Sequence, residues 1–509
     1  MSERSDVIII GGGHNGLIAA AYLSRARLKV SILEKNSAVG GATVSQQVFP
    51  DYQARLSRYS YLVSLLPTKI VQDLGLSFTT LGRSISSYTV DTVGDLTVSR
   101  EDEELNRESF AHLTGSTAEY DSWKSFYADV QRIADAIAPT MLEKLPTRSE
   151  LKQRVNHPIW EEIIERPLGE SLERRFSDDL VRGVVFTDGL IGTFADAHDI
   201  ATNRCFIYHV IGNGTGEWRV PRGGMGGLVT ELRDLCIAQG VRIITDAEVT
   251  TLRRSGDWQI KTSMGATYES TFVLANFAPQ HLAQALGEEP PASLDGSQVK
   301  VNMLLTRLPR LKSGVDPRIA FAGTFHFDEK YSDLQKAFAQ SSAGVIPDRI
   351  PAEMYCHTLT DTSILSADLV AAGFHTLTLF GIHTPASLFD ADHDDVKAEV
   401  LRRLFSQLND YLLDPIEECL ARAADGSLCI EIKSPHELEH DVSLPRGNIF
   451  HKDLSMPFRE DGTAPSWGVE TAHPNLYICG AGAIRGGGVS GIPGHNAAAA
   501  VLEQLHLTP

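Results

Sequence analysis

The chain has 509 residues, of which 42% are hydrophobic and 22% charged, which is enough for two or three domains with filled cores. Its formal net charge of −19 argues against a nucleic-acid partner, because phosphates are bound by clusters of lysine and arginine. We find no apolar run long enough to cross a bilayer and no secretory signal pattern. We therefore expect a cytoplasmic protein, and peripheral membrane contact and the oligomeric state are left open.

The first predicted unit is a strand, a glycine-rich turn and a helix in the stretch DVIIIGGGHNGLIAAAYL. Gly11, Gly13 and Gly16 fit the G-x-G-x-x-G pattern between a strand and a helix predicted over His14–Arg25. A second predicted strand, KVSILEK, contains Glu34 close to the spacing of about 20 residues at which a carboxylate binds ribose hydroxyls. Since the helix N-terminus favours phosphate, this unit predicts a dinucleotide site.

Two further glycine-rich segments indicate that the dinucleotide is FAD. Gly40 and Gly41 follow Glu34, which resembles the flavoprotein pattern in which such a pair also approaches the pyrophosphate. The segment LYICGAGAIRGGGVSGIPGHNAAAAVLEQL predicts a strand, a glycine-rich crossing and a helix that starts near Gly491 and Pro493. Such a helix N-terminus can stabilise a reduced, anionic flavin. Because only one G-x-G-x-x-G pattern is present, we expect no separate NAD domain.

The rest of the chain alternates between helical and extended patterns. Helices are predicted over about 115–185, from Gly223 to a C-terminal cap at Gly240, and over 394–412. Apolar alternation from about 297 to 385 predicts a sheet. Four further strands are predicted between these segments, at 241–245, 249–252, 258–262 and 272–275.

Six segments resemble the phytoene-desaturase-related FAD-dependent oxidoreductases: GGGHNGLIAAAYL, LEKNSAVGGATVS, RLSRYSYLVSLL, WRVPRGGMGGL, RGNIFHKDLS and YICGAGAIRGGGVSGIPGHNAA. Within that family the chain is most similar to the branch of pyridine nucleotide-disulphide oxidoreductase domain-containing protein 2. The resemblance implies an α/β fold (α+β overall) with a Rossmann-like FAD-binding domain of the glutathione-reductase or amine-oxidase type. A substrate domain of mixed sheet and helices is inserted into it. The implied FAD-binding domain comprises 1–75, 215–290 and 435–509, and the substrate domain comprises 76–214 and 291–434.

The resemblance also implies which residues hold FAD without a covalent bond. They come from the glycine turn, the two segments that follow it, one strand residue near 249 and the C-terminal crossing. They are Gly11, Gly13, His14, Asn15, Gly16, Glu34, Lys35, Gly40, Gly41, Ala42, Thr43, Val249, Gly480, Gly482, Gly491, Ile492 and Pro493.

The activity implied by the resemblance is hydride transfer between flavin N5 and an apolar, polyene or long-chain substrate, as in desaturation. Carotenoid desaturases carry an arginine directly after the glycine pair, where this chain has Ala42 and Thr43, and this argues against a carotenoid. Four alternatives stay open: an NAD(P)H-fuelled reductase or cyclase of a polyene natural product, a redox-neutral isomerase, an FAD amine oxidase, and a flavin-binding interaction protein without turnover. NAD(P)H is thus a candidate reductant.

Four residues in the family-like segments are candidate catalytic residues. Arg58 and Arg222 could place a positive charge near the flavin and favour its reduced anion, although a structural salt bridge explains either of them equally well. His451 and His495 flank the C-terminal motifs and could serve either the active site or an ordinary hydrogen-bonding role.

Two segments have the composition of metal sites, but we expect no metal. His436 to His440 fit the zinc pattern H-E-x-x-H, but the third ligand of the extended motif is missing, so a chance match on a surface turn is expected. The run DADHDD is interpreted as the acidic start of the next helix. The chain has no Cys-x-x-Cys, which excludes the usual dithiol redox motif.

Overall fold

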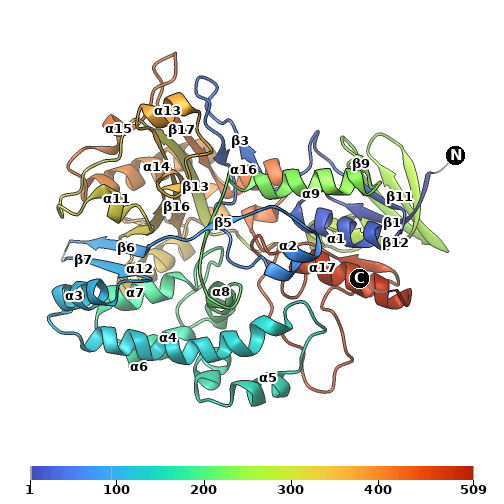
Figure 1. The fold of residues 1–509 in the computed structure, drawn as a ribbon, viewed down its shortest axis with the longest axis horizontal. Coiled ribbons are helices and arrows are strands. Elements are labelled where there is room, and N and C mark those ends of the chain that lie inside the picture. Colours follow the sequence, from blue (N-terminus) through green and yellow to red (C-terminus); the bar gives the residue numbers. More distant parts are fainter. Residues whose placement is uncertain (1–2, 93, 508–509) are drawn as a thin grey trace.

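The computed structural model describes residues 3–92 and 94–507. In this part of the chain the two main sheets, each of seven strands, lie at opposite ends of the view in Figure 1. Helices from residues 103–211 gather below the second sheet (Figure 1). None of the described helices is long and apolar enough to cross a membrane.

The first sheet has a parallel centre in the order β18-β12-β1-β2-β9, and β11 and β10 extend it as an antiparallel meander beside β12. The side chains of Val7–Ile10 in β1 are at most 6% exposed, because both faces of a parallel sheet are covered. The strands of this sheet are β1 (Glu3–Ile10), β2 (Val30–Leu33), β9 (Arg242–Ile244), β10 (Val249–Ser255), β11 (Asp257–Thr262), β12 (Thr267–Ala275) and β18 (Leu476–Ile478).

Three helices pack together on one face of this sheet. The contacts of α1 with α9 and α17 build a core in which alanines of α1 and α17 allow the helices to lie close. These helices are α1 (His14–Arg25), α9 (Gly226–Ala238) and α17 (Ile492–Gln504). The fold class is therefore the α/β arrangement that the resemblance implies, with a Rossmann-like parallel sheet at its centre.

The second sheet has the order β17-β13-β16-β15-β14-β6-β7 and is antiparallel except where β14 meets β6. Its strands are β6 (Ile85–Asp91), β7 (Gly94–Ser99), β13 (Gln298–Leu305), β14 (Thr324–Phe327), β15 (Ala352–Tyr355), β16 (His375–Ile382) and β17 (Ile430–Lys433). Four two-residue strands make two small ladders elsewhere: β3 (Ser45–Gln46) with β4 (Leu56–Ser57), and β5 (Thr80–Leu81) with β8 (Val220–Pro221).

The two faces of the second sheet differ in chemistry. One face packs on α14 and carries apolar side chains such as Phe325, Met354 and Leu379. On the opposite face, cross-strand pairing aligns one residue from each of six strands in what we call the polar row: Thr89, His326, Glu353, Phe380, Lys300 and Lys433. All of these except Lys433 are buried, so this face is covered by other parts of the chain.

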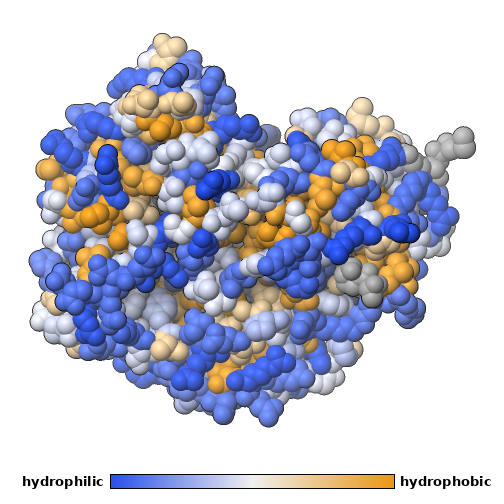
Figure 2. Space-filling view, in the orientation of Figure 1, coloured by the Kyte–Doolittle hydropathy of each residue, from blue (hydrophilic) through white to orange (hydrophobic). Residues whose placement is uncertain are grey.

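The remaining helices are α2 (Thr68–Asp73), α3 (Glu103–Thr114), α4 (Ala118–Ile137), α5 (Arg148–Val155), α6 (Leu168–Arg175), α7 (Asp179–Thr187), α8 (Ile200–Ile211), α10 (Pro279–Leu286), α11 (Pro317–Ala320), α12 (Tyr331–Ser342), α13 (Ala367–Ala371), α14 (His393–Asn409), α15 (Ile416–Cys419) and α16 (Pro435–Val442). Of these, α10 packs on β10 of the first sheet and Ile70 of α2 joins the core around α1. Hydrophilic residues cover most of the surface visible in Figure 2.

The predicted elements are present with shifted ends. The predicted strand at 272–275 is the last part of β12, which begins five residues earlier because its first half pairs with β11. The helix predicted over 394–412 ends at Asn409. The prediction of a surface turn at His436 was wrong, because this segment forms α16. The helix begins with a reciprocal capping box between Ser434 and Glu437.

Candidate functional site

The glycine turn joins β1 to α1 and leaves room for a ligand backbone. A Cβ on Gly16 would lie 2.3 Å from the carbonyl oxygen of Gly11, so only glycine fits beneath the turn. The amide of Gly40 donates to the carbonyl of Gly12 over 2.9 Å, which brings the second glycine pair beside the first. Gly13 is the N-cap of α1, and a Cβ there would lie 3.1 Å from the side-chain nitrogen of Asn276.

Glu34 lies at the end of β2 next to this turn. Its two carboxylate oxygens accept hydrogen bonds from the backbone amides of Gly12, over 2.7 Å, and Asn36, over 2.8 Å. These bonds fix the carboxylate at the position from which the dinucleotide pattern expects it to bind a ribose.

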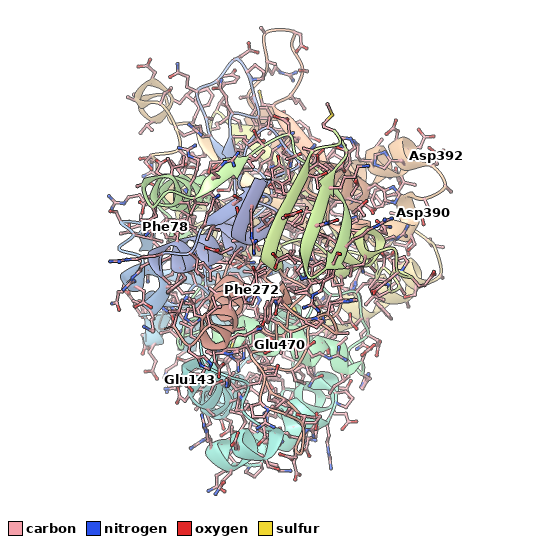
Figure 3. The ribbon with its side chains drawn as sticks, turned by 90° about the vertical axis from the view of Figure 1, so that its right-hand side faces the viewer. Phe78, Glu143, Phe272, Asp390, Asp392 and Glu470 are labelled. Carbon is pink, nitrogen blue, oxygen red and sulfur yellow. The ribbon has the colours of Figure 1, made fainter. Side chains whose placement is uncertain are left out.

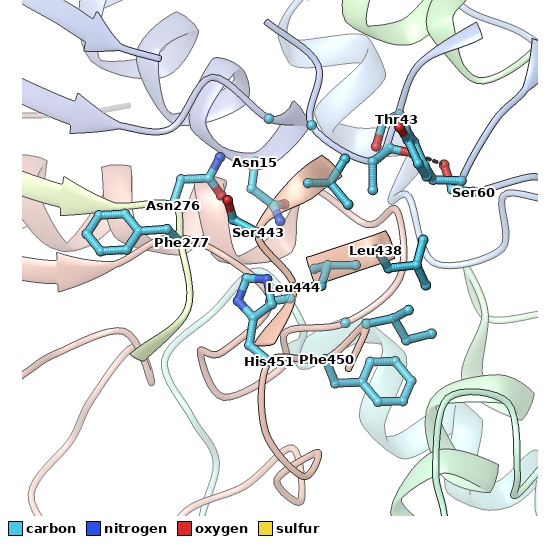
Figure 4. A pocket seen from close by; sticks show the side chains of 18 of the residues that line it. Asn15, Thr43, Ser60, Asn276, Phe277, Leu438, Ser443, Leu444, Phe450 and His451 are labelled. Atoms are coloured by element: carbon cyan, nitrogen blue, oxygen red, sulfur yellow. Dashed lines mark hydrogen bonds between the residues drawn. The ribbon is translucent and has the colours of Figure 1, made fainter. Parts of the chain in front are cut away.

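A cavity of about 570 Å³ opens over the turn and continues away from it. Figure 4 shows Asn15, Asn276 and His451, from three separate segments, around the same space, with Phe450 further along. Of the residues implied to hold FAD, these line the cavity: Gly11, Gly13, His14, Asn15, Glu34, Lys35, Gly40, Gly41, Ala42, Thr43 and Val249.

The other implied cofactor residues do not line this cavity. Gly16 packs beneath the turn, and Gly491, Ile492 and Pro493 begin α17 beside α1. Gly480 and Gly482 pack against Asn276 and Pro279. From the same C-terminal crossing, Ala481 and 486–489 reach the cavity instead.

Several buried polar atoms in the cavity wall have no partner within the described structure. They are His14 Nε2, Asn15 Oδ1, Trp218 Nε1, Ser297 Oγ, Gln298 Nε2 and His451 Nδ1. A buried polar group without a partner is costly, so these atoms fit an elongated ligand that offers both donors and acceptors. Together with the glycine cradle and Glu34, they fit a dinucleotide such as FAD.

Both cavity-lining histidines of the predicted set are neutral. Burial lowers the pKa of His14 to about 4, and the Thr43 Oγ1 atom lies 2.9 Å from its Nδ1 atom. Burial, followed by the neighbouring His281, lowers the pKa of His451 to about 4. Neither side chain therefore brings a positive charge to the cavity at neutral pH.

The other three candidate catalytic residues do not line the cavity. Arg58 donates from Nε to the Glu431 carboxylate over 2.8 Å. Arg222 is exposed, and its amide donates to Thr79. His495 is buried against Tyr22, with ring centroids 5.0 Å apart.

The histidines of the H-E-x-x-H segment each lie beside an aspartate. His436 Nε2 lies 2.9 Å from Asp390, and the His440 and Asp441 side chains are 3.0 Å apart. Asp390 and Asp392 lie at the edge of the molecule in Figure 3, away from β10–β12. Within the described residues, no group of three or more histidine, cysteine, aspartate or glutamate side chains is arranged to hold a metal.

Sequence reasoning missed Lys300, which lines the cavity from the polar row. Its side chain is 2% exposed, and its ammonium donates to the carbonyl of Ser57 over 2.8 Å. The Nζ atom lies 5.8 Å from the ring centroid of Tyr61 and 5.3 Å from that of Phe380. Burial lowers the pKa of Lys300 well below its usual value.

Sequence reasoning also missed the far wall of the cavity, which includes His209 and Trp218, whose rings are tilted by 33° with centroids 4.3 Å apart. A signal for such residues was present in the sequence. In VKVNML of β13, polar side chains alternate with apolar ones although the surrounding strands suggest a sheet buried on both faces. Buried titratable groups are frequent at functional sites, so this alternation could have pointed to Lys300.

Comparison with known proteins agrees with this geometry. The family model of NAD(P)-binding Rossmann-like domains matches residues 9–68. An uncharacterised protein of Mycobacterium tuberculosis is 42% identical over 98% of this chain and 97% of its own length. The mouse pyridine nucleotide-disulfide oxidoreductase domain-containing protein 2 is 26% identical over 99% of this chain and 94% of its own. This chain belongs to the FAD-dependent oxidoreductase family. It is accordingly an enzyme of the oxidoreductase class.

Two further proteins resemble part or all of the chain at lower identity. A carotenoid 3,4-desaturase of Haloarcula japonica is 26% identical over 56% of this chain and 59% of its own length. A solved structure of a putrescine oxidase mutant superimposes with a TM-score of 0.61 and 16% identity, covering 99% of this chain and 100% of that one. At this identity the superposition supports the fold alone.

Proposed function

We propose that this FAD-dependent oxidoreductase acts on an apolar, polyene or long-chain substrate, and that the reaction is hydride transfer of the desaturation type. The observation that carries the proposal is the continuity of one cavity from the glycine turn to a region of apolar side chains. That apolar region includes Leu62, Leu65, Ile191, Ile449, Phe450 and Leu454.

The chain's own residues would hold the cofactor at one end of the cavity. The turn amides near Gly13 and the N-terminus of α1 suit the pyrophosphate, and Glu34 suits a ribose. FAD, when bound, supplies a hydride acceptor or donor at its N5 atom. We also propose that 1–75, 215–290 and 435–509 form the FAD-binding domain and that the rest forms the substrate domain.

The apolar end suits a hydrocarbon chain because burying apolar surface is favourable at about 25 cal/mol per Å². The family likeness to a carotenoid desaturase supports the same reaction type. A long substrate without charge would pack against Phe450 and Leu454 while the cofactor excludes water from the other end.

The first test is anaerobic. The purified protein should bind FAD and be yellow, and its visible flavin band should persist when NADH or NADPH is added but bleach with a long-chain or polyene substrate. Bleaching by NADPH would instead support a reductase or cyclase, and bleaching by simple amines with peroxide formed in air would support an amine oxidase. A protein that binds no FAD would contradict the proposal altogether.

A further inference from the structure

The far wall of the cavity carries a hydrogen-bond donor that has no acceptor within the described residues. This donor is the indole Nε1 atom of Trp218, which is buried although the residue lines the cavity. An indole nitrogen can donate a hydrogen bond but cannot accept one. Because a buried donor without an acceptor is costly, the far wall lacks a group that offers an acceptor atom.

The chain brings Trp218 to the cavity by a tight turn after α8. In this turn Gly216 has a φ of +63°, and a Cβ there would lie 2.9 Å from the carbonyl oxygen of Val210. The turn returns the chain toward α8, where the indole lies beside the ring of His209 with a tilt of 33° and centroids 4.3 Å apart. The position of Trp218 is therefore set by the backbone of this turn.

The backbone around Trp218 is fixed by further hydrogen bonds. Arg83 Nε donates to the carbonyl of Trp218 over 3.2 Å. The amide of Arg219 donates to the carbonyl of Val63 over 2.9 Å, and the amide of Val63 donates back over 3.0 Å. Held by these bonds and by the contact of its ring with His209, the indole has little freedom to turn toward another acceptor.

The surroundings of Trp218 are apolar. The chain that pairs with Arg219 continues from Val63 to Leu65, which lines the cavity. Leu65 belongs to one buried cluster with Phe450 and Leu454, which line the apolar end of the cavity. The unpartnered donor therefore borders the region into which we propose that an apolar substrate binds.

Other polar side chains of this wall have partners inside the protein. The Cys205 thiol donates to the carbonyl of Ile191 over 3.2 Å. The Tyr208 hydroxyl donates to the carbonyl of Ser455 over 3.0 Å. These two groups need no ligand, whereas Trp218 Nε1 does.

The place of Trp218 also separates it from the unpartnered atoms near the cofactor. His14 and Asn15 belong to the glycine turn, where the dinucleotide is expected, but Trp218 belongs to the far wall. We propose that Trp218 recognises an oxygen atom of the substrate, which is then an apolar chain with a hydroxyl or carbonyl group and not a plain hydrocarbon. This inference rests on the proposed function and deepens it.

Trp218 would set specificity without taking part in the chemistry. Its N–H donates to the oxygen while the chain fills the apolar end, and no covalent bond is made or broken. A site built to bond a polar group rejects an analogue that lacks the group, because the protein donor is then left unpaired. Hydroxyl and carbonyl oxygens share the required acceptor chemistry, so the test includes one ligand of each kind.

The test is calorimetry on the full-length FAD-loaded protein without oxygen. The ligands are farnesol, farnesal and farnesene, which share an isoprenoid chain and carry a hydroxyl, a carbonyl and no oxygen. Trp218→Phe keeps an aromatic ring but lacks the N–H. It should weaken the binding of farnesol, farnesal or both by about tenfold and change that of farnesene by less than about twofold. Comparing each ligand with itself in the two proteins removes its own solvation cost.

A second measurement reads the donor in the wild-type protein. The chain has five tryptophans, so nitrogen-15 labelling of the indoles gives a spectrum with few resonances. The resonance of Trp218 should move when farnesol or farnesal is added and stay within its linewidth with farnesene. This result does not depend on how well a variant folds.

The matched control is Trp467→Phe, because Trp467 Nε1 donates to Glu503 over 2.7 Å and so has its own partner. It should leave all three affinities unchanged, and thermal melts show whether each variant is folded. A loss confined to farnesol assigns the hydroxyl source, and one confined to farnesal the carbonyl source. An equal loss for all three ligands, no loss for any, or a loss of FAD affinity alone would overturn the inference. The expected pattern of affinities without bleaching of the flavin by any substrate would count only against the proposed function.

Discussion

The Nζ atom of Lys300 lies 2.8 Å from the carbonyl oxygen of Ser57, on the buried polar face of the second sheet. Although the rings of Tyr61 and Phe380 lie beside this amine, burial disfavours its charged form and lowers the pKa of Lys300 well below its usual value. The folded protein therefore gives up the proton of this side chain at a lower pH than the unfolded chain does.

This difference predicts a pH dependence of stability. The folded pKa of Lys300 is lowered, so between that value and the unfolded pKa of 10.5 the unfolded state binds more protons, and folding becomes more favourable as the pH rises through this window. Each pH unit in that window is worth at most about 1.4 kcal/mol of unfolding free energy. Urea unfolding at pH values from neutral to about 9.5 should give a flatter profile for Lys300→Met than for the wild type. The surface variant Lys69→Met should keep the wild-type slope.

Gly16→Ala should abolish FAD retention. The added Cβ would lie 2.3 Å from the Gly11 carbonyl oxygen, so the turn must open and the phosphate cradle is lost. The ratio of flavin to protein absorbance after purification measures this. Gly227→Ala in α9 is the control, because its Cβ would come no closer than 3.4 Å to another atom, and a yellow Gly16→Ala protein would refute the prediction.

Glu34→Ala should weaken FAD binding and also lower stability. The change leaves the amides of Gly12 and Asn36 without their acceptors, at a cost of roughly 2 kcal/mol in unfolding free energy even without cofactor. Chemical unfolding of the apoprotein and a fluorescence titration with FAD separate the two effects. If the variant apoprotein unfolds like the wild type and binds FAD with normal affinity, the carboxylate contributes neither to stability nor to cofactor binding.

We expect the ion pair of Glu162, in the helical region, to stabilise the fold at neutral pH but not in acid. Burial opposes ionisation, but the Arg175 guanidinium at 2.9 Å lowers the pKa of Glu162 to about 2. A lowered carboxylate pKa stabilises the fold above the unfolded value of 4.5, and this contribution is lost as the pH falls toward 2. Glu162→Gln should cost about 1–2 kcal/mol at neutral pH and much less near pH 3. The control is Glu161→Gln at the neighbouring exposed residue, which should change the unfolding free energy little at either pH.

The part of the fold that could be predicted from the sequence is the part built from local patterns. The G-x-G-x-x-G turn, Glu34 and the helix after Gly223 each depend on residues close in the chain, and the structure places turn and carboxylate together. The resemblance to a flavoprotein family then supplied the overall architecture, which the comparisons support.

The buried polar groups behind the cavity wall could not be predicted because their pairing depends on contacts between distant segments. His326 and Glu353 meet only after β14 pairs with β15, and Asp188 and His209 come from separate helical segments. Arg58 lies in a family-like segment, but its partner could not be predicted from that segment. The partner is Glu431, which lies 373 positions away in the chain. Periodicity reports which side chains share a face, but not which partner faces them.

The two-faced second sheet has a consequence for how this enzyme could change its substrate during evolution. Inserting or deleting one residue in β13 would move Lys300 into the apolar layer against α14 and would turn a valine, Val299 or Val301, toward the cavity. We therefore expect insertions and deletions in these strands to be eliminated during evolution. New specificities would have to arise by point substitution at the few positions of the polar row, or in the segments that cover it.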